Sequence, residues 1–478
     1  MENIKKVHLI CNAHLDPIWQ WRWDEGISAA VSTFRSAAEL CDEFNYVFCH
    51  GESLLYEAIE EYAPDLFKKI QQLVKEGKWH IMGGWYLQPD CNMPSGESFV
   101  RQIREGQRYF KEKFGVSPKT AINFDPFGHT RGLVQIIKKA GQDSYLFMRP
   151  YASEMDLPSE QFVWVGFDGS EIKANRQPSY NTHLGVSAIE IVERVKNMPE
   201  PVINVLWGVG NHGGGPSRKD LKDIENLDIE NTQFIHSTPE QFFSEINPVN
   251  KVDKSLRTSM PGCYVTMSKL KSKYVKIENL FYEVEAMVSL CKLNGIDIKC
   301  DELKEAEKSL LFSQFHDLLP GTSVKAGEEN CLQRLYYAEE LLSRIKTRAF
   351  FLLTDDFKQA GEGEYPIFVY NPHPYKVKAL VSCEFSLADQ NWNDNIFTYV
   401  DVYKDGEKVP SQLGFEDSNL NLDWRKKVVF EAELEPLCVT RFDAKARGEN
   451  TPNVKYREYP EVLDDLVYTD LGRTIKIS

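Results

Sequence analysis

The stretch HLICNAHLDPIWQWRWDEG, residues 8–26, decides how the amino-terminal part of this chain folds. It continues an apolar run, KKVHLICN at residues 5–12, which has the composition of a buried strand. His14 and Asp16 follow that run. Because they stand two apart on an extended segment, their side chains project the same way. The pair predicts a two-pronged metal clamp; taken alone, it also suits a buried histidine with a loop aspartate as its partner.

Short β-rich runs alternate with amphipathic helical patterns from residue 5 to about residue 245. Such alternation predicts parallel strands with helical crossovers, in a mostly parallel, barrel-like α/β domain that we place at residues 1–258. In these folds, ligands gather at the carboxyl ends of the strands. The predicted strands are KKVHLICN, YVFCHG, WHIMGGWY, TAINFD, SYLFMR and PVINVLWGVG, and the helical patterns include SLLYEAIEEYAPDLFKKIQQLVKEG and ESFVRQIREGQRYFKEKFG.

The pattern changes twice further along the chain. Three long helical runs with short breaks predict a three-helix bundle at residues 259–360. Alternating strands with turn signals then predict a β-rich domain of the sandwich type at residues 361–478. Because the last residues, LVYTDLGRTIKIS, still follow a strand pattern, we expect this β-domain to be incomplete.

Composition limits the partners and the compartment. A formal net charge of −15 argues against nucleic acid or an anionic membrane surface as the main partner. The sequence shows neither a signal peptide nor an apolar run of the ~20 residues that a membrane span needs. The ten cysteines form no CxxC pairs and are expected to be reduced thiols. These features predict a cytoplasmic protein, and they leave open whether it forms a homo-oligomer.

Two further stretches carry metal-ligand chemistry. TAINFDPFGHT, residues 120–130, ends an apolar strand with Asp125, and strand-end carboxylates in this architecture are often functional. SLLFSQFHDLLPGTS, residues 309–323, is predicted to place His316 on the last turn of a bundle helix. A lone histidine there is commonly a cation favoured by the helix dipole.

Together, HLDPIW, FDPFGHT and QFHDLLPGTS occur in the order and at the separations found in one family. In this the chain resembles glycoside hydrolase family 38, the retaining α-mannosidases. The resemblance implies one Zn²⁺ per chain, a catalytic nucleophile at Asp125, and α-mannoside oligosaccharides or N-glycan fragments as substrates. The zinc ligands it implies are His14, Asp16, Asp125 and His316.

The resemblance also implies substrate contacts. Trp19 matches an aromatic wall against which the apolar face of a sugar packs, and Phe127 is a candidate for a second wall. Trp21 and Trp23 are equally well explained as core. The polar contacts it implies are Arg149 and Asp317, which on their own also suit a solvated salt bridge and a helix-end surface carboxylate. Tyr180, in QPSYNTH, is a further candidate for a phenol that contacts substrate.

The residue types support this chemistry on their own terms. Two imidazoles and two carboxylates suit Zn²⁺, with open positions for substrate oxygens. A cation that binds two neighbouring hydroxyls selects sugars with both on one face, as O2 and O3 of mannose are. The free oxygen of Asp125 could then attack the anomeric carbon, which would give a covalent mannosyl-aspartate and retention of configuration.

The general acid is not obvious. A retaining hydrolase needs a second carboxyl roughly 5–5.5 Å from the nucleophile. Relatives in this family carry an aspartate before a glycine-rich run, but here NVLWGVGNHGGGPS, residues 204–217, has Asn211 at that position. The proton could come from His212, whose imidazole titrates near neutrality, or from Asp168, or the chain could be poorly active. We favour His212.

Two other functions fit parts of the pattern. A metal-dependent carbohydrate deacetylase also uses a histidine and an aspartate on an α/β scaffold. A mannose-binding protein without turnover would explain Asn211.

Overall fold

The computed structural model describes residues 4–256, 259–418, 422–450, 466–470 and 473–477. The chain forms two compact units, one made of Met1–Phe281 with Asp301–Ser343 and the other of Tyr282–Cys300 with Arg344–Ser478. The division passes through the helical region. The boundaries at residues 258 and 360 therefore stay predictions.

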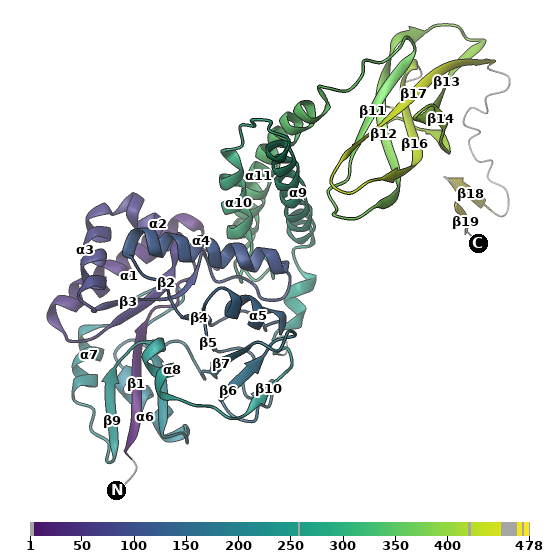
Figure 1. The fold of residues 1–478 in the computed structure, drawn as a ribbon. Helices are drawn as coiled ribbons and strands as arrows, with labels where there is room; N and C mark the ends of the chain where they lie inside the picture. Colours follow the sequence, from purple (N-terminus) through teal and green to yellow (C-terminus); the bar gives the residue numbers. More distant parts are fainter. Residues whose placement is uncertain (1–3, 257–258, 419–421, 451–465, 471–472, 478) are drawn as a thin grey trace. The chain divides into compact units, whose positions relative to one another are not determined.

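The first unit contains a five-stranded parallel sheet with β1 (Lys5–Asn12) at its centre (Figure 1). One edge of β1 pairs along its length with β8 (Val202–Trp207). Its other edge pairs first with β9 (Thr232–His236) and then with β2 (Phe48–Glu52), which in turn pairs with β3 (Trp79–Trp85). Because all these strands are parallel, their carboxyl ends meet at one edge.

A second five-stranded sheet has the order β10-β6-β7-β5-β4. Only β6 and β7 are antiparallel. The predicted parallel strands with helical crossovers are confirmed, but the described strands pair as two separate sheets, so closure into a barrel stays a prediction. The strands are β4 (Thr120–Asn123), β5 (Ser144–Phe147), β6 (Gln161–Val165), β7 (Glu171–Arg176) and β10 (Lys251–Val252).

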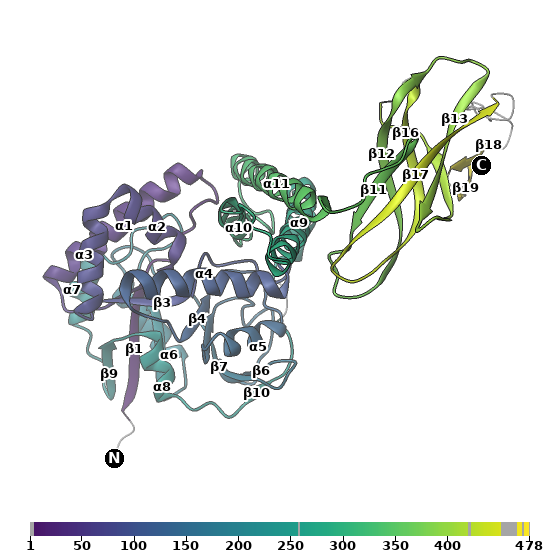
Figure 2. The same cartoon turned by 45° about the horizontal axis from the view of Figure 1, so that its top comes forward.

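Eight helices of this unit lie between or beside these strands (Figure 2). The single helix predicted from residue 53 is in fact two helices. The break occurs at Pro64, which has no N–H to continue the first helix and is well suited to begin the next. The helices are α1 (Trp23–Glu43), α2 (Ser53–Tyr62), α3 (Pro64–Lys75), α4 (Gly96–Phe114), α5 (Gly132–Lys139), α6 (Ser187–Asn197), α7 (Arg218–Glu225) and α8 (Pro239–Glu245).

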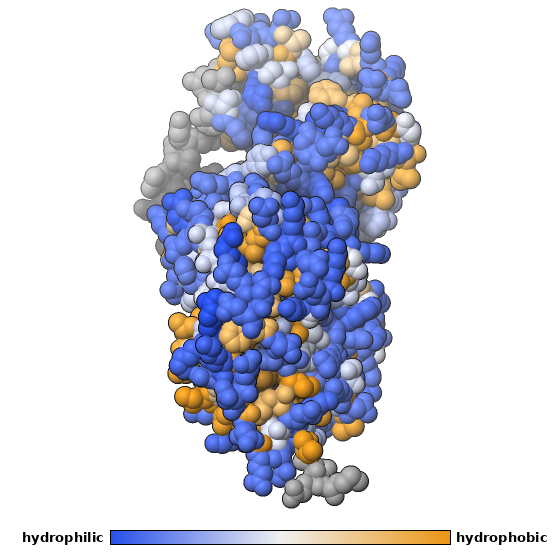
Figure 3. All heavy atoms as spheres, turned by 90° about the vertical axis from the view of Figure 1, so that its left-hand side faces the viewer, coloured by the Kyte–Doolittle hydropathy of each residue, from blue (hydrophilic) through white to orange (hydrophobic). Residues whose placement is uncertain are grey.

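Aromatic packing holds the first sheet against its helices. The buried Trp79 ring lies 4.6 Å from Phe48 and 5.3 Å from Phe34, measured between ring centroids. Helix α4 approaches β3 so closely that a Cβ atom on Gly106 would lie 2.3 Å from the Gly84 carbonyl oxygen. On the face shown in Figure 3, hydrophilic residues predominate and apolar residues form scattered groups.

Three long helices follow: α9 (Ser268–Leu293), α10 (Glu302–Ser313) and α11 (Lys325–Thr354). They occupy the three predicted helical runs, and their association as a bundle stays a prediction. The position predicted for His316 was wrong. Helix α10 ends at Ser313, so His316 lies in the turn beyond it. No helix in the described part of the chain is long and apolar enough to cross a membrane.

The second unit carries the predicted β-rich region as two antiparallel sheets, β11-β17-β13-β14 and β12-β16-β15, with a hairpin of β18 and β19. Buried Phe430 and Phe442, one from each sheet, pack with ring centroids 4.9 Å apart. The strands are β11 (Glu364–Tyr370), β12 (Val377–Asn391), β13 (Ile396–Lys404), β14 (Glu407–Lys408), β15 (Ser411–Gly414), β16 (Asp423–Leu434), β17 (Val439–Asn450), β18 (Leu466–Asp470) and β19 (Arg473–Ile477).

Candidate active site and metal centre

Three of the four predicted metal ligands converge in the first unit. Asp16 Oδ1 lies 3.0 Å from His14 Nε2 and 3.4 Å from His316 Nε2. The three side chains are buried, and their ligand atoms all lie within 4.8 Å of one another. Among the described residues, this is the one cluster of histidine, cysteine and acidic side chains with the spacing of a metal site.

Backbone hydrogen bonds fix the clamp at the end of β1. Leu15 forms a parallel bridge with Asn211, which follows β8. The Asn211 N–H donates to the His14 carbonyl over 2.6 Å, and the Asp16 N–H donates to the Asn211 carbonyl over 3.0 Å. The loops after two adjacent parallel strands are thus hydrogen-bonded to each other, and position 211 lies directly beside the predicted metal ligands His14 and Asp16.

A separate set of contacts orients His316. The Asp90 N–H donates to the Gln314 carbonyl over 2.7 Å, and Phe315 bridges Pro89. His316 Nδ1 lies 3.0 Å from the Gln88 carbonyl oxygen, an acceptor that favours the tautomer with a free Nε2. The His316 ring stacks on His14 with centroids 5.3 Å apart.

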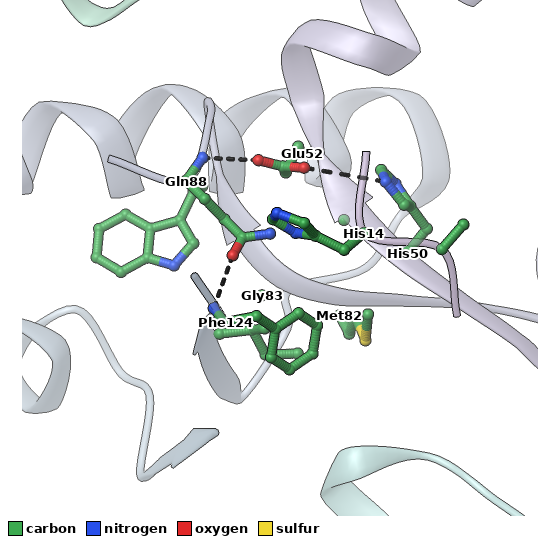
Figure 4. A pocket seen from close by; sticks show the side chains of 11 residues that line it. His14, His50, Glu52, Met82, Gly83, Gln88 and Phe124 are labelled. Atoms are coloured by element: carbon green, nitrogen blue, oxygen red, sulfur yellow. Dashed lines mark hydrogen bonds and ion pairs between the residues drawn. The ribbon is translucent and has the colours of Figure 1, made fainter. Parts of the chain in front are cut away.

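Gln88 connects three parts of the site. Besides accepting from His316, it donates its N–H to Glu52 Oε1 over 2.7 Å (Figure 4). Its side-chain Oε1 accepts from the Phe124 N–H over 2.9 Å, directly before Asp125. The sequence did not reveal Gln88 or Glu52. The available signal was that both follow predicted parallel strands, whose carboxyl ends share an edge.

Asp125, the fourth predicted ligand, does not belong to the cluster of three. Its Oδ1 accepts a hydrogen bond from Arg149 Nε over 2.6 Å. The Arg149 guanidinium also lies over the rings of Phe127 and Tyr151, 5.6 Å and 5.0 Å from their centroids. Burial would lower the pKa of Arg149, but Asp125 outweighs it and keeps the cation charged. Arg149, a predicted substrate contact, therefore pairs with this carboxylate and lies over the ring of Phe127, another predicted contact.

In the cluster of three, burial and neighbouring charges shift the pKa values in opposite directions. Burial would raise the pKa of Asp16, yet the imidazoles of His14 and His316 lower it below its usual range. Burial would lower the pKa of His316, but Asp16, with Asp317 and Asp125, raises it to about 10. Burial, reinforced by the charge of Asp16, raises the pKa of Asp317. Asp16 thus favours a positive charge beside it, of the kind that a metal cation would supply.

The donor set fits a divalent metal ion. Within the described residues, His14 Nε2, Asp16 Oδ1 and His316 Nε2 are buried and make no hydrogen bond. Leaving such atoms unpaired costs about 1–3 kcal/mol each. Two imidazole nitrogens and a carboxylate oxygen are ligands that Zn²⁺ prefers, and three protein ligands leave a position open.

Two predicted substrate contacts lie against the cluster. The Tyr180 hydroxyl donates to Asn211 Oδ1 over 2.7 Å, and its ring lies 4.6 Å from the His14 ring. Asp317 is buried beside His316, and its Oδ1 accepts from the Thr322 hydroxyl over 2.6 Å. Both side chains can present polar groups to a ligand at the open position.

The three tryptophans differ in their surroundings. Trp19 is half-buried, and its carbonyl accepts from the Val324 N–H over 2.8 Å, shortly after the His316 turn. Trp21 donates its indole N–H to the Asp16 carbonyl over 2.9 Å. Trp23 packs edge-on against Phe312, 5.4 Å between centroids. Trp23 therefore serves packing, whereas Trp19 and Trp21 lie close to the ligands.

The two alternative proton donors lie in different places. His212 is half-exposed, with its Nε2 2.9 Å from Glu25 Oε1 and its ring edge-on to Trp21. Asp168 precedes β7 in the turn after β6 and pairs with Lys139 over 2.8 Å. Because β7 runs parallel to β5, and β5 to β4, this turn lies at the edge where β4 begins. Asp125 lies at the opposite edge, which argues against Asp168 as the donor.

Comparison with known proteins places the chain in a family. Residues 5–261 match the model of the glycosyl hydrolases family 38 N-terminal domain, which is more than half of the 478 residues. The chain belongs to glycosyl hydrolase family 38. Residues 260–353 match the alpha mannosidase middle domain.

Relatives in this family include alpha-mannosidase G of Dictyostelium discoideum, 28% identical over 349 residues, which cover 70% of this chain and 32% of that protein. Alpha-mannosidase 2C1 of Mus musculus is 25% identical over 355 residues, covering 71% and 34%. The chain thus spans about a third of the length of these relatives.

The solved structure of an alpha-mannosidase from Enterococcus faecalis V583 has a TM-score of 0.76 at 18% identity, and the match covers 93% of this chain and 56% of that one. This likeness shows the fold.

Proposed function

We propose that this protein is a zinc-dependent retaining α-mannosidase that cleaves α-linked mannose from oligosaccharides or N-glycan fragments. The observation that carries the proposal is the convergence of His14 and Asp16 with His316, which lies 300 or more positions later in the sequence, on one buried point. Family membership supports glycoside hydrolysis over amide hydrolysis by a deacetylase. The names of the relatives support mannose as the sugar.

In this proposal His14, Asp16 and His316 hold Zn²⁺, and Asp125 completes the set. When bound, the ion supplies positive charge that orients two neighbouring sugar hydroxyls. Trp19 and Phe127 pack against the sugar, and Tyr180 and Asp317 accept or donate hydrogen bonds to its hydroxyls.

Asp125 acts as the nucleophile. One carboxylate oxygen attacks the anomeric carbon while the bond from that carbon to the leaving oxygen breaks, giving a covalent mannosyl-aspartate. Arg149 Nε donates a hydrogen bond to Asp125 Oδ1 over 2.6 Å and so aims the carboxylate. A water molecule then attacks the same carbon from the other face and releases Asp125, so configuration is retained.

His212 supplies the proton to the leaving oxygen in the first step and takes one from water in the second. Its pairing with Glu25 supports this role, because a carboxylate partner orients the imidazole. Asn211 helps to fix the site: its Oδ1 accepts a hydrogen bond from the Tyr180 hydroxyl, and its backbone is hydrogen-bonded to His14 and Asp16.

The domain assignments remain part of the proposal: a catalytic α/β domain at residues 1–258, a helical domain at 259–360 and a β-rich domain at 361–478. The match to the middle-domain model over residues 260–353 supports the second of these. We also propose a cytoplasmic location, which the ten free cysteines support.

The test is hydrolysis of 4-nitrophenyl α-mannoside by the zinc-loaded protein, with 4-nitrophenyl α-glucoside as the comparison sugar. We expect turnover of the mannoside only, loss of turnover after chelation, recovery on adding zinc, and α-mannose as the first product by NMR. Inverted product, or full activity in metal-free protein, would contradict the proposal. Tight mannose binding without hydrolysis of this activated substrate would instead support a binding protein.

A further inference from the structure

A small pocket lies behind the metal clamp, lined by His14 and by residues of β2, β3 and the ends of neighbouring strands (Figure 4). Its space for water is about 10 Å³, which is close to the volume that a single ordered water needs. The pocket is lined by Ala13, His14, His50, Gly51, Glu52, Met82, Gly83, Trp85, Gln88, Ile122 and Phe124.

Several polar atoms of the lining residues make no hydrogen bond within the described part of the chain, although Glu52 Oε2 lies 4.0 Å from His50 Nε2. They are His14 Nδ1, Glu52 Oε2, His50 Nδ1 and Trp85 Nε1, and all four residues are at most 2% exposed. A single unpaired buried polar atom costs about 1–3 kcal/mol, so four around one pocket point to a shared hydrogen-bonding ligand. A polar pocket of this size with two to four partners is the kind that holds a water molecule.

His14 and His316 differ in the contacts of Nδ1, the ring nitrogen that does not face Asp16. Both direct Nε2 toward Asp16. When Nε2 binds the proposed metal ion, the proton of the neutral ring is on Nδ1. For His316 that nitrogen has a direct acceptor, the Gln88 carbonyl at 3.0 Å. For His14, no acceptor is found among the described residues. Glu52, which lines the same pocket, has an oxygen, Oε2, that makes no hydrogen bond there. A water between them would complete the pattern that metal-binding histidines show.

We propose that Glu52 positions His14 for metal binding through one buried water, which accepts a hydrogen bond from His14 Nδ1–H and donates one to Glu52 Oε2. The inference rests on the proposed metal site and deepens it. Trp85 Nε1–H is a second donor available to the water. Glu52 itself is held in place, since its other oxygen accepts the Gln88 N–H over 2.7 Å. Gln88 therefore supports both histidines, one directly and one through Glu52.

Replacing Glu52 with glutamine isolates the role. The new side chain has one oxygen and one NH₂ group for two places that both require an acceptor. Either the water loses its acceptor, or the NH₂ group meets the Gln88 N–H. We expect the zinc affinity of the full chain, measured by competition with a chromophoric chelator, to fall about 10–100-fold.

The control is Glu60→Gln, which removes a carboxylate of α2 that pairs with Lys113 and does not line the pocket. It should bind zinc as the wild type does. A second readout distinguishes positioning from general destabilisation. In ¹⁵N-histidine NMR of the zinc form, the His14 Nδ1–H proton should exchange slowly in the wild type and in Glu60→Gln, and rapidly in Glu52→Gln.

Should Glu52→Gln fail to fold, a high-resolution crystal structure of the wild type decides. It should show one water within hydrogen-bonding distance of both His14 Nδ1 and Glu52 Oε2, and an empty pocket would overturn the inference. Zinc affinity of Glu52→Gln within twofold of the wild type, with the slow proton retained, would overturn it too while leaving the proposed function intact. A wild type that binds no zinc would overturn both.

Discussion

Replacing His212 with alanine tests the assignment of the proton donor through the leaving group of the substrate. A general acid contributes typically 10²–10⁴-fold, or about 2.7–5.4 kcal/mol, when the leaving oxygen is basic. An α-linked mannobiose has such a leaving group, whereas 2,4-dinitrophenolate departs without protonation. His212→Ala should therefore lower kcat/KM for mannobiose by about 10²–10⁴-fold and change that for 2,4-dinitrophenyl α-mannoside by less than about threefold.

The partner of His212 gives a graded version of this test. The pair with Glu25 is more than half exposed on both sides, and such pairs contribute about 0.2–1 kcal/mol. Glu25→Gln should therefore slow mannobiose hydrolysis by only about 1.4–5-fold. His183→Ala is the matched control, because His183 forms another exposed pair, with Glu190 at 2.7 Å. It should leave both substrates unaffected.

A second substitution offers rescue. Asn211 has φ +64°, a conformation that aspartate also tolerates, and its Oδ1 accepts from Tyr180. Asn211→Asp in the His212→Ala background should restore part of the mannobiose activity by placing a carboxyl beside the clamp. Equal losses on both substrates in His212→Ala, with metal content unchanged, would refute the reasoning.

Three further outcomes are expected. Asp125→Ala should abolish turnover and weaken zinc retention together, because one carboxylate serves both; a fully active variant would exclude it as the nucleophile. Zinc binding at pH 7 should release at least about one proton per ion, measured by calorimetry in buffers of different ionisation enthalpy. Burial would lower the pKa of His316 but Asp16 raises it to about 10, so the metal displaces a proton and zinc affinity rises with pH. Zinc binding without proton release would contradict this expectation. Gly106→Ala should destabilise the protein by about 1–3 kcal/mol in urea unfolding, since its Cβ would lie 2.3 Å from the Gly84 carbonyl; unchanged stability would mean that α4 can move away from β3.

Local sequence patterns were sufficient to place a side chain where its position depends only on neighbouring residues. His14 and Asp16 could be placed together because side chains alternate along an extended segment, and Asp125 could be placed at a strand end because an apolar run stops there. Local patterns failed where distant contacts compete. The apolar sequence around Phe315 suits a helix, but the bridge to Pro89 and the hydrogen bond from Asp90 to Gln314 end α10 early and turn His316 toward Asp16.

Other residues carry no local signal at all. Glu52 is the last residue of an ordinary buried strand, and its role depends on a hydrogen bond from Gln88, which is 36 positions away. The β6–β7 hairpin was overlooked for a different reason. Its turn at Asp168 and Gly169 carries a hairpin signal, but the strands are short and lie within a region dominated by parallel alternation.

The central claim is that one divalent ion is held by side chains from near the beginning and near the end of the residues that form the first unit. Anomalous diffraction at the zinc absorption edge, from crystals of the zinc-loaded protein, locates the ion directly. We predict one strong peak about 2.0–2.2 Å from His14 Nε2, Asp16 Oδ1 and His316 Nε2, with an Asp125 oxygen completing the site. A peak elsewhere in the chain, or none between these three atoms, would contradict the claim.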